Sequence, residues 1–383
     1  MSEPIRQRRR SLRLMAMAAT AAAAVGAAYV MAMDSASADE TVVVGDTAQL
    51  TEAVRNATAG TTISVKAGTY RPTETIKART SGTAADPIAL RPYGDGAVVV
   101  DGSDLPDGSW LFGIYAGHWH VRDMAFTNSP AHGFVVTSST GGVFSNLTTS
   151  HNGDSGFTLR GEGTNDNLVV NLDSFRNYDA ANNGENADGI AVKYGSGTGN
   201  VIRNARLYEN ADDGLDLWAW ESPIRIENSW AHGNGHNRWD DPDWQGDGNG
   251  YKLGGNGENV AHTVVDNAAW GNAGHGYTEN GNEGRMQIFR NTAYANDKNG
   301  FYFADGASRL ARNLAVDNAD GVGKFGDRTL SAANGWDEGV EVPGFRSTDA
   351  SQADRPRRAD GSLPEVEFLK TGTSEIGAPM TGR

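Results

Sequence analysis

The segments ENADGIAVK (Glu185–Lys193), ENADDGLDLW (Glu209–Trp218) and GNGYKLGG (Gly248–Gly255) share one pattern, in which a glycine precedes alternating apolar and outward-facing residues. A β-strand with one buried face requires this alternation. If the three segments are neighbouring strands of one sheet, their equivalent positions stack about 4.8 Å apart. The sequence therefore predicts that side chains from distant parts of the chain meet on one face.

This stacking would gather four aspartates and one lysine into a single patch. Asp188 and Asp213 share the position just before the glycine, with Asp212 beside them. Asp216 and Lys252 share the outward position two residues after the glycine. Carboxylates this close repel one another strongly unless they are protonated or bind a cation. Oxygen ligands without histidine or cysteine select Ca²⁺ or Mg²⁺, and crowded anionic ligands favour the larger ion. The patch therefore predicts a calcium site beside a candidate base.

The glycine pattern recurs along most of the chain at intervals of 21 to 36 residues, at Gly133, Gly156, Gly189, Gly214, Gly250, Gly276, Gly300 and Gly321. Asparagine recurs four positions before the glycine, at Asn152, Asn210, Asn272 and Asn296. A second asparagine column comprises Asn146, Asn171, Asn204, Asn228, Asn267, Asn291 and Asn313. Such periods, with asparagine at the corners and few helix signals, indicate a parallel β-helix of about ten coils.

The N-terminal segment departs from the repeat. Residues 1–38 contain five arginines, an apolar stretch and the small residues Ala36-Ser37-Ala38. These features predict a signal peptide and a secreted, extracellular protein that starts at Asp39, with the choice between Sec and twin-arginine export left open. Asp46 and Gln49 have capping-box spacing, which predicts a short helix that covers the first coil.

The repeat divides the rest of the chain into two regions. We expect residues 39–330 to form the β-helix domain and residues 331–383 to form an irregular extension packed on it. Two intervals are abnormally long, with the excess at Tyr178–Ala187 and Gly235–Gly248. Because insertions in a solenoid emerge as loops on one face, we expect both to flank the carboxylate patch. For Trp239 and Trp244 in the second insertion, sugar stacking and packing within a lid remain open.

The charge and composition exclude several classes of protein. The net charge of −15 argues against nucleic-acid binding, and the absence of cysteine excludes disulfides. After residues 1–38, no apolar run is long enough to cross a bilayer, so we expect no membrane association. We expect a monomer whose partner is an anionic polysaccharide, which an acidic protein binds only where cations are concentrated at the site.

The motifs ADG, ADDGLD and GNGYKLGG resemble polysaccharide lyase family nine, the pectate lyases, and the likeness runs from about Asn146 to Asn318. The LPEVEFLK sequence near the C-terminus fits as well. The resemblance implies a right-handed parallel β-helix in which four aspartates hold calcium and a lysine is the Brønsted base. Leu215 departs from the family, where an aromatic residue is common, and this bears on packing more than on chemistry. Matched by motif, the ligands are Asp188, Asp212, Asp213 and Asp216, and the base is Lys252.

A further column, four residues after the glycine, contains Arg160, Lys193 and Trp218. Two cations and an aromatic ring in line on one face would suit a chain of uronic acids. We therefore predict that these residues bind substrate, with ordinary surface charge as the alternative.

Together these features predict a calcium-dependent lyase that cleaves polygalacturonate by β-elimination. The base takes the proton α to the carboxylate, and calcium stabilises the charge that develops. Lys252 must then be neutral, although the pKa of a free lysine is about 10.4. Rival interpretations are a lyase or epimerase on another polyuronate such as alginate, and a non-catalytic polysaccharide-binding β-helix. There are three further alternatives. The first is a hydrolase, suggested by Gly274-His275-Gly276. The others are a calcium site that only links two coils and a structural salt bridge between Lys252 and Asp216.

Overall fold

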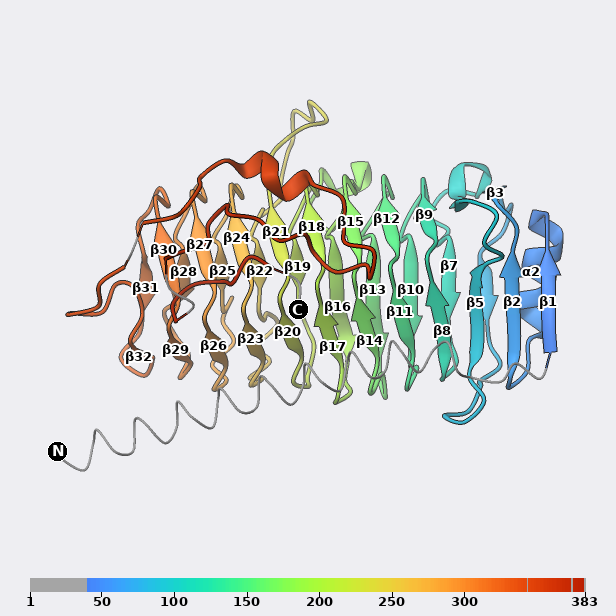
Figure 1. The fold of residues 1–383 in the computed structure, drawn as a ribbon, viewed down its shortest axis with the longest axis horizontal. Coiled ribbons are helices and arrows are strands. Elements are labelled where there is room, and N and C mark those ends of the chain that lie inside the picture. The colour runs from blue at the N-terminus through green and yellow to red at the C-terminus, as the bar shows by residue number, and fades with distance from the viewer. Residues whose placement is uncertain (1–39, 343, 373–374, 382–383) are drawn as a thin grey trace.

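The computed structural model describes residues 40–342, 344–372 and 375–381. The predicted signal peptide, residues 1–38, lies outside the described residues. Three parallel β-sheets run the length of the molecule, and successive strands of the chain enter them in turn (Figure 1). This arrangement confirms the predicted parallel β-helix.

Each sheet is built from one short strand per coil. Sheet I has twelve strands, β1 (Glu40–Val44), β2 (Thr61–Val65), β5 (Ile88–Pro92), β8 (Trp119–Arg122), β11 (Val143–Ser145), β14 (Leu168–Val170), β17 (Val201–Arg203), β20 (Arg225–Glu227), β23 (Thr263–Val265), β26 (Gln287–Phe289), β29 (Arg309–Ala311) and β32 (Leu330–Ala332). Sheet II has ten strands, β4 (Ile76–Ala78), β7 (Phe112–Ile114), β10 (Phe134–Thr137), β13 (Phe157–Gly161), β16 (Ile190–Gly195), β19 (Leu215–Asp216), β22 (Tyr251–Lys252), β25 (Tyr277–Thr278), β28 (Phe301–Phe303) and β31 (Gly323–Phe325). Sheet III also has ten, β3 (Gly68–Tyr70), β6 (Val98–Asp101), β9 (Ala125–Thr127), β12 (Thr148–Ser150), β15 (Asp173–Phe175), β18 (Arg206–Tyr208), β21 (Trp230–His232), β24 (Ala268–Trp270), β27 (Thr292–Tyr294) and β30 (Leu314–Val316).

The repeated glycines set the register of sheet II. The residue after each glycine pairs with its counterpart from Phe134 through to Phe301, as predicted. A Cβ atom at Gly189 would lie 2.6 Å from the carbonyl oxygen of Gly214, so no larger residue fits. The last predicted repeat is wrong, because Phe301 pairs with Gly323 and not with Val322. Gly321 instead closes a turn at a φ of 88°, and the strand therefore begins later.

Stacked rings fill the interior behind sheet II. The Phe112, Phe134 and Phe157 rings are stacked with centroids 5.2 and 5.4 Å apart. Tyr251, Tyr277 and Phe301 form a second stack with centroids 4.9 and 4.8 Å apart. All of these side chains are buried, and each contributes roughly 1.5–3 kcal/mol of hydrophobic stabilisation.

Buried asparagine side chains link the coils as predicted, and the first ladder is longer than the sequence pattern showed. Amide-to-carbonyl hydrogen bonds of 2.8 to 3.0 Å join Asn152, Asn177, Asn210, Asn234, Asn272, Asn296 and Asn318. The second predicted column is in fact two adjacent ladders. Asn146, Asn171 and Asn204 occupy one position, whereas Asn267 and Asn291 lie one residue further along the chain.

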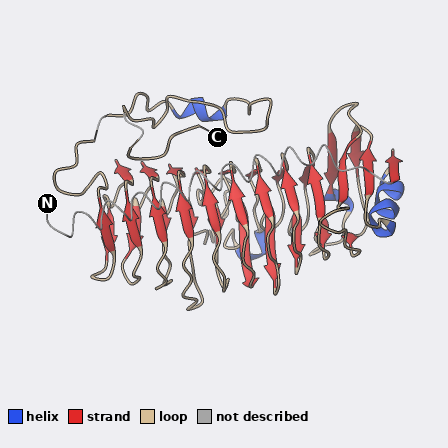
Figure 2. Ribbon diagram, turned by 60° about the horizontal axis from the view of Figure 1, so that its bottom comes forward, coloured by secondary structure: helices blue, strands red, loops and turns tan. Residues whose placement is uncertain are grey.

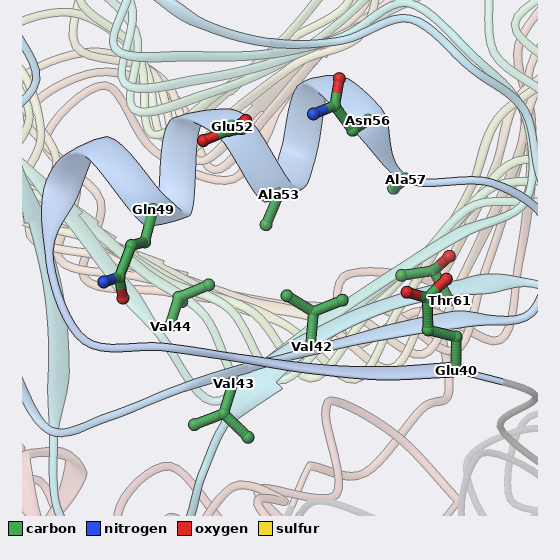
Figure 3. Close-up of a pocket in the computed structure, with 10 residues that line it drawn as sticks. All are labelled: Glu40, Val42, Val43, Val44, Gln49, Glu52, Ala53, Asn56, Ala57 and Thr61. Atoms are coloured by element: carbon green, nitrogen blue, oxygen red, sulfur yellow. The ribbon is translucent and has the colours of Figure 1, made fainter.

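A helix covers the first coil, as predicted. Helix α2 (Thr47–Asn56) begins where Asp46 Oδ1 accepts a 2.8 Å hydrogen bond from the amide of Gln49. Leu50 and Val54 are its buried residues. A hollow of about 300 Å³ lies between this helix and β1, with Ala53 facing Val42 (Figure 3). This hollow is at the end of the solenoid, far in the strand order from the predicted carboxylate patch.

After β32 the chain runs back along the solenoid (Figure 2), and it lies beside the strands of sheet III (Figure 1). The segment contains the short helix η3 (Ala350–Asp354), and two other such helices lie earlier in the chain, η1 (Gly102–Asp104) and η2 (Ala180–Asn182). Arg357 donates hydrogen bonds to Asp173 and to two backbone carbonyls of the coils, and the Phe368 ring packs on Trp270. Among the described residues, no helix is long and apolar enough to cross a membrane.

Candidate active site

The predicted carboxylates meet on the outer side of sheet II, where β16, β19 and β22 are neighbours (Figure 1). Ala191 pairs with Asp216, and Asp216 pairs with Lys252. The outward position of Asp216 and Lys252 is therefore confirmed. Asp188, Asp212 and Asp213 immediately precede β16 and β19, which places them at the start of the same strands.

Asp188 and Asp213 belong to a ladder of polar side chains at the position before each glycine. Ser155 Oγ donates a 3.1 Å hydrogen bond to Asp188 Oδ2, and the amide of Asp213 donates to Asp188 Oδ1 at 3.3 Å. Asn249 donates to Asp213 Oδ1 from its backbone and its side chain, at 2.6 and 2.9 Å. His275 continues the ladder through its amide, which donates to Asn249 Oδ1. The ladder fixes both oxygens of Asp188 and one oxygen of Asp213.

The four aspartates form one tight and buried cluster. Asp188, Asp212, Asp213 and Asp216 each offer an oxygen atom, and these atoms all lie within 4.8 Å of one another. No other such group of acidic or histidine side chains occurs among the described residues. Burial raises the pKa of Asp213 to about 6, and the Lys252 ammonium opposes this shift only in part. Burial likewise raises the pKa of Asp188 and Asp212, so the cluster disfavours full ionisation without a cation.

Two lysines, one on each of the two strands beside β19, partly neutralise the cluster. Lys193 Nζ lies 2.8 Å from Asp188 Oδ2 and 2.8 Å from Asp216 Oδ2. Lys252 Nζ lies 3.3 Å from Asp213 Oδ2, 3.5 Å from Asp216 Oδ2 and 3.0 Å from Asp247 Oδ2. Burial alone would lower the pKa of both lysines, but the surrounding carboxylates outweigh it and raise both values.

The cluster also retains oxygen atoms that are suited to a metal ion. Asp216 Oδ1 is buried without a hydrogen-bond partner, and Asp213 Oδ2 accepts no hydrogen bond and has only the Lys252 ammonium 3.3 Å away. Buried polar atoms without partners are costly, and a cation would satisfy them. All the available ligand atoms are carboxylate oxygens, which suit a hard divalent cation such as Ca²⁺. These residues therefore fit the predicted ion.

The two insertions pack on each other beside the cluster. The Tyr178 ring, from the first insertion, stacks on Trp239 of the second with centroids 4.7 Å apart. Trp244 stacks on Trp239 and donates a 3.0 Å hydrogen bond to the carbonyl of Gly235. The tryptophans thus pack within the loop. The second insertion also brings Asp247 to Lys252, a contact that spacing alone did not predict.

Arg160 and Trp218 lie beside the cluster in an arrangement that adds two aromatic residues to the predicted column. Arg160 pairs with Lys193 in the sheet register, and its guanidinium lies over the rings of Trp110 and Tyr194, 5.2 and 5.7 Å from their centroids. Trp218 contacts the Tyr194 ring edge to face at 5.2 Å. Trp110 lies outside the glycine pattern, which is why the sequence did not single it out. Lys193, predicted in the same column, instead directs its amine to the aspartates.

Comparison with known proteins identifies the family. Residues 28–315 match the model of the Pel9A-like right-handed β-helix region. The chain belongs to this family. Pectate lyase PEL9 of Emericella nidulans is 38% identical over 362 residues, which cover 85% of this chain and 88% of the relative. Pectate lyase L of Dickeya chrysanthemi is 34% identical over 348 residues, which cover 85% and 79% of the two chains. As a Pel9A-like protein with these relatives, the chain is a polysaccharide lyase.

A solved structure supports the same assignment. The crystal structure of pectate lyase Pel9A superimposes with a TM-score of 0.79 at 29% identity, covering 88% of this chain and 90% of the other. The resemblance to the pectate lyases and the predicted fold are thus confirmed, including the right-handed winding named by the family model.

Proposed function

We propose that this Pel9A-like protein is a secreted, calcium-dependent pectate lyase that cleaves polygalacturonate by β-elimination. The observation that carries the proposal is the buried four-aspartate cluster with Lys252 at its edge. The names of its relatives support pectate as the substrate. The signal-like sequence of residues 1–38 supports secretion, and an exported protein whose first residue is Asp39 would test it.

In this proposal Asp188, Asp212, Asp213 and Asp216 hold the ion, and Lys252 removes the proton α to the substrate's carboxylate. The electron pair of the broken C–H bond forms a carbon–carbon double bond as the glycosidic oxygen leaves with the C–O bonding pair and takes up a proton from water. A bound calcium ion would supply positive charge that stabilises the developing carbanion and lowers the pKa of Lys252. Lys252 reaches the cluster from the adjoining strand, which supports its proposed role as the proton acceptor.

The surface next to the cluster supplies the proposed substrate contacts. Arg160 provides a cation held between two rings, and Trp218 offers an apolar face on the same side. Arginine pairs with a carboxylate through two parallel hydrogen bonds, which suits the repeated carboxylates of a polyuronate. Lys193 is the third proposed member, because its position adjoins Arg160 and its amine lies beside the proposed ligands Asp188 and Asp216.

Absorbance of the unsaturated uronate product tests this function. Polygalacturonate and alginate should be compared side by side, with chelator-treated protein and after calcium is restored. We expect ultraviolet absorbance to rise on polygalacturonate, to disappear after chelation and to return with Ca²⁺. Full activity after rigorous chelation would remove the calcium assignment, activity confined to alginate would change the substrate, and no product on either would favour a binding protein.

A further inference from the structure

Lys193 belongs to the outward column of β16, but its amine turns into the carboxylate cluster. Nζ lies 2.8 Å from both Asp188 Oδ2 and Asp216 Oδ2, and the lysine side chain is 13% exposed. The two carboxylates are themselves buried. An ammonium held between two buried carboxylates at this distance makes strong charge-assisted hydrogen bonds and is costly to remove. Lys193 is therefore an integral part of the cluster.

The environment of Lys193 differs from that of Lys252. Lys252 makes its shortest contact with Asp247, whose side chain is 55% exposed on the long insertion. Lys193 has both of its carboxylate contacts inside the cluster, one from the residue that precedes β16 and one from β19. It thereby joins two neighbouring coils through the groups that would also bind the ion.

The charge balance shows what Lys193 contributes. With every group ionised, the four aspartates and two lysines carry a net charge of −2, which one divalent cation would balance. Removal of Lys193 would leave −3 among buried oxygen atoms that lie within 4.8 Å of one another. Their mutual repulsion would weaken the ion-free protein. The same change would remove a positive charge that repels an incoming cation.

We propose that Lys193 is a built-in cation of the metal site. It holds Asp188 and Asp216 in place when no ion is bound, and its charge weakens divalent binding so that the ion can exchange. This inference rests on the calcium site of the proposed function. Lys193 is thus a positioning residue that acts through Asp188 and Asp216.

The test is calcium titration by calorimetry, together with thermal unfolding in metal-free buffer and in saturating Ca²⁺. Lys193→Met keeps the length of the side chain and removes its charge. We expect its melting temperature to fall in metal-free buffer, the deficit to shrink with calcium, and the calcium dissociation constant to tighten about ten- to a hundredfold. The control is Arg160→Met, which removes a cation in register with Lys193 and should leave the dissociation constant within about twofold.

A second variant separates charge from packing and remains informative if Lys193→Met folds poorly without metal. Adding Asp188→Asn to Lys193→Met should recover most of the lost metal-free stability, because the buried negative charge leaves with its partner. No recovery would assign the effect to packing and overturn the inference, as would an unchanged or weaker calcium affinity in Lys193→Met. A wild-type protein that binds no calcium would instead overturn the metal site of the proposed function.

Discussion

Asp216 and Lys252 pair in register on adjacent strands, and Lys252 Nζ lies 3.5 Å from Asp216 Oδ2. One parallel strand pairing therefore fixes the relative positions of a proposed metal ligand and the proposed base. Because a one-residue slip would turn one of the two side chains into the core, the register of β19 and β22 is a condition for activity.

Removing the base should stop turnover without unfolding the protein. Lys252→Met should lower kcat about 10²- to 10⁴-fold in saturating calcium, since this is the usual contribution of a general base. The melting temperature in calcium should stay close to that of the wild type. Lys324→Met, at the equivalent outward position three strands further along, is the matched control and should keep normal turnover. Wild-type rates in Lys252→Met would reduce this lysine to a structural partner of Asp216.

The pH–rate profile should rise through the alkaline range, with an optimum above pH 8 and little activity at pH 5. The carboxylates around Lys252 raise its pKa in the metal-free protein, and bound calcium would lower this value only in part, so little of the amine is neutral near pH 7. Initial rates across this range at fixed calcium measure the effect. An acidic optimum would indicate a carboxyl general acid and favour a hydrolase.

The metal-free protein should lose stability as the pH rises from about 4 to about 6. Burial raises the folded-state pKa of Asp213 to about 6, above its unfolded value, so the stabilisation is present at low pH and lost through pH 6. Thermal unfolding of metal-stripped protein, compared with Asp213→Asn, isolates this contribution. We expect the unfolding free energy of the wild type minus that of Asp213→Asn to fall with pH, because only the wild type must ionise this buried carboxyl. A value that rises with pH would contradict the buried geometry of this carboxyl.

The guanidinium between the two rings should act on substrate binding. Arg160→Met should raise KM about tenfold, with a smaller effect on kcat, because it removes a charged contact remote from the reacting bond. Arg312 lies 5.9 Å from the Phe289 ring beside sheet I and gives the matched control, Arg312→Met. Steady-state rates on polygalacturonate distinguish the two. Equal KM values for both variants would assign Arg160 to ordinary surface charge.

The C-terminal segment should matter for stability through one buried charge pair. Arg357→Met should cost about 1–3 kcal/mol of unfolding free energy, because two backbone carbonyls lose a donor while Asp173 keeps Arg206 as an ionic partner. Arg358→Met, one residue along, removes a half-exposed pair with Glu365 and should cost about 1 kcal/mol or less. Denaturant unfolding compares them. Equal losses would mean that the buried pair contributes little.

The period-two pattern predicted the part of the site that register determines. Asp188, Asp213, Asp216 and Lys252 lie where stacking in register places them, because parallel pairing fixes backbone positions. The pattern did not predict the direction of long side chains or the path of the inserted loops. Lys193 has an outward position, yet the negative charge beside it draws its amine into the cluster. Asp247 reaches Lys252 from an insertion that has no period at all.

The last coil and the asparagine columns show that the repeat pattern also failed to predict small shifts of the backbone. Gly321 matches the repeat in sequence but closes a turn, which displaces the strand that follows. Asn228 and Asn267 occupy different columns, although their spacing resembles that of the other members. The spacing of residues in the sequence does not reveal a one-residue shift at a corner. Only the hydrogen bonds show which asparagines share a column.

The segment that returns along sheet III joins coils that the repeat alone would leave independent. Contacts in a solenoid are largely between neighbouring coils, so such a protein can in principle melt from either end. Here Arg357 holds β15, Phe368 packs on β24, and the amide of Ala378 donates to Thr292 of β27. The final stretch of chain thus spans the coils that carry the carboxylates and those beyond them. The C-terminal segment therefore couples the unfolding of these coils. The coils that would hold the ion cannot open one at a time unless the segment detaches from them.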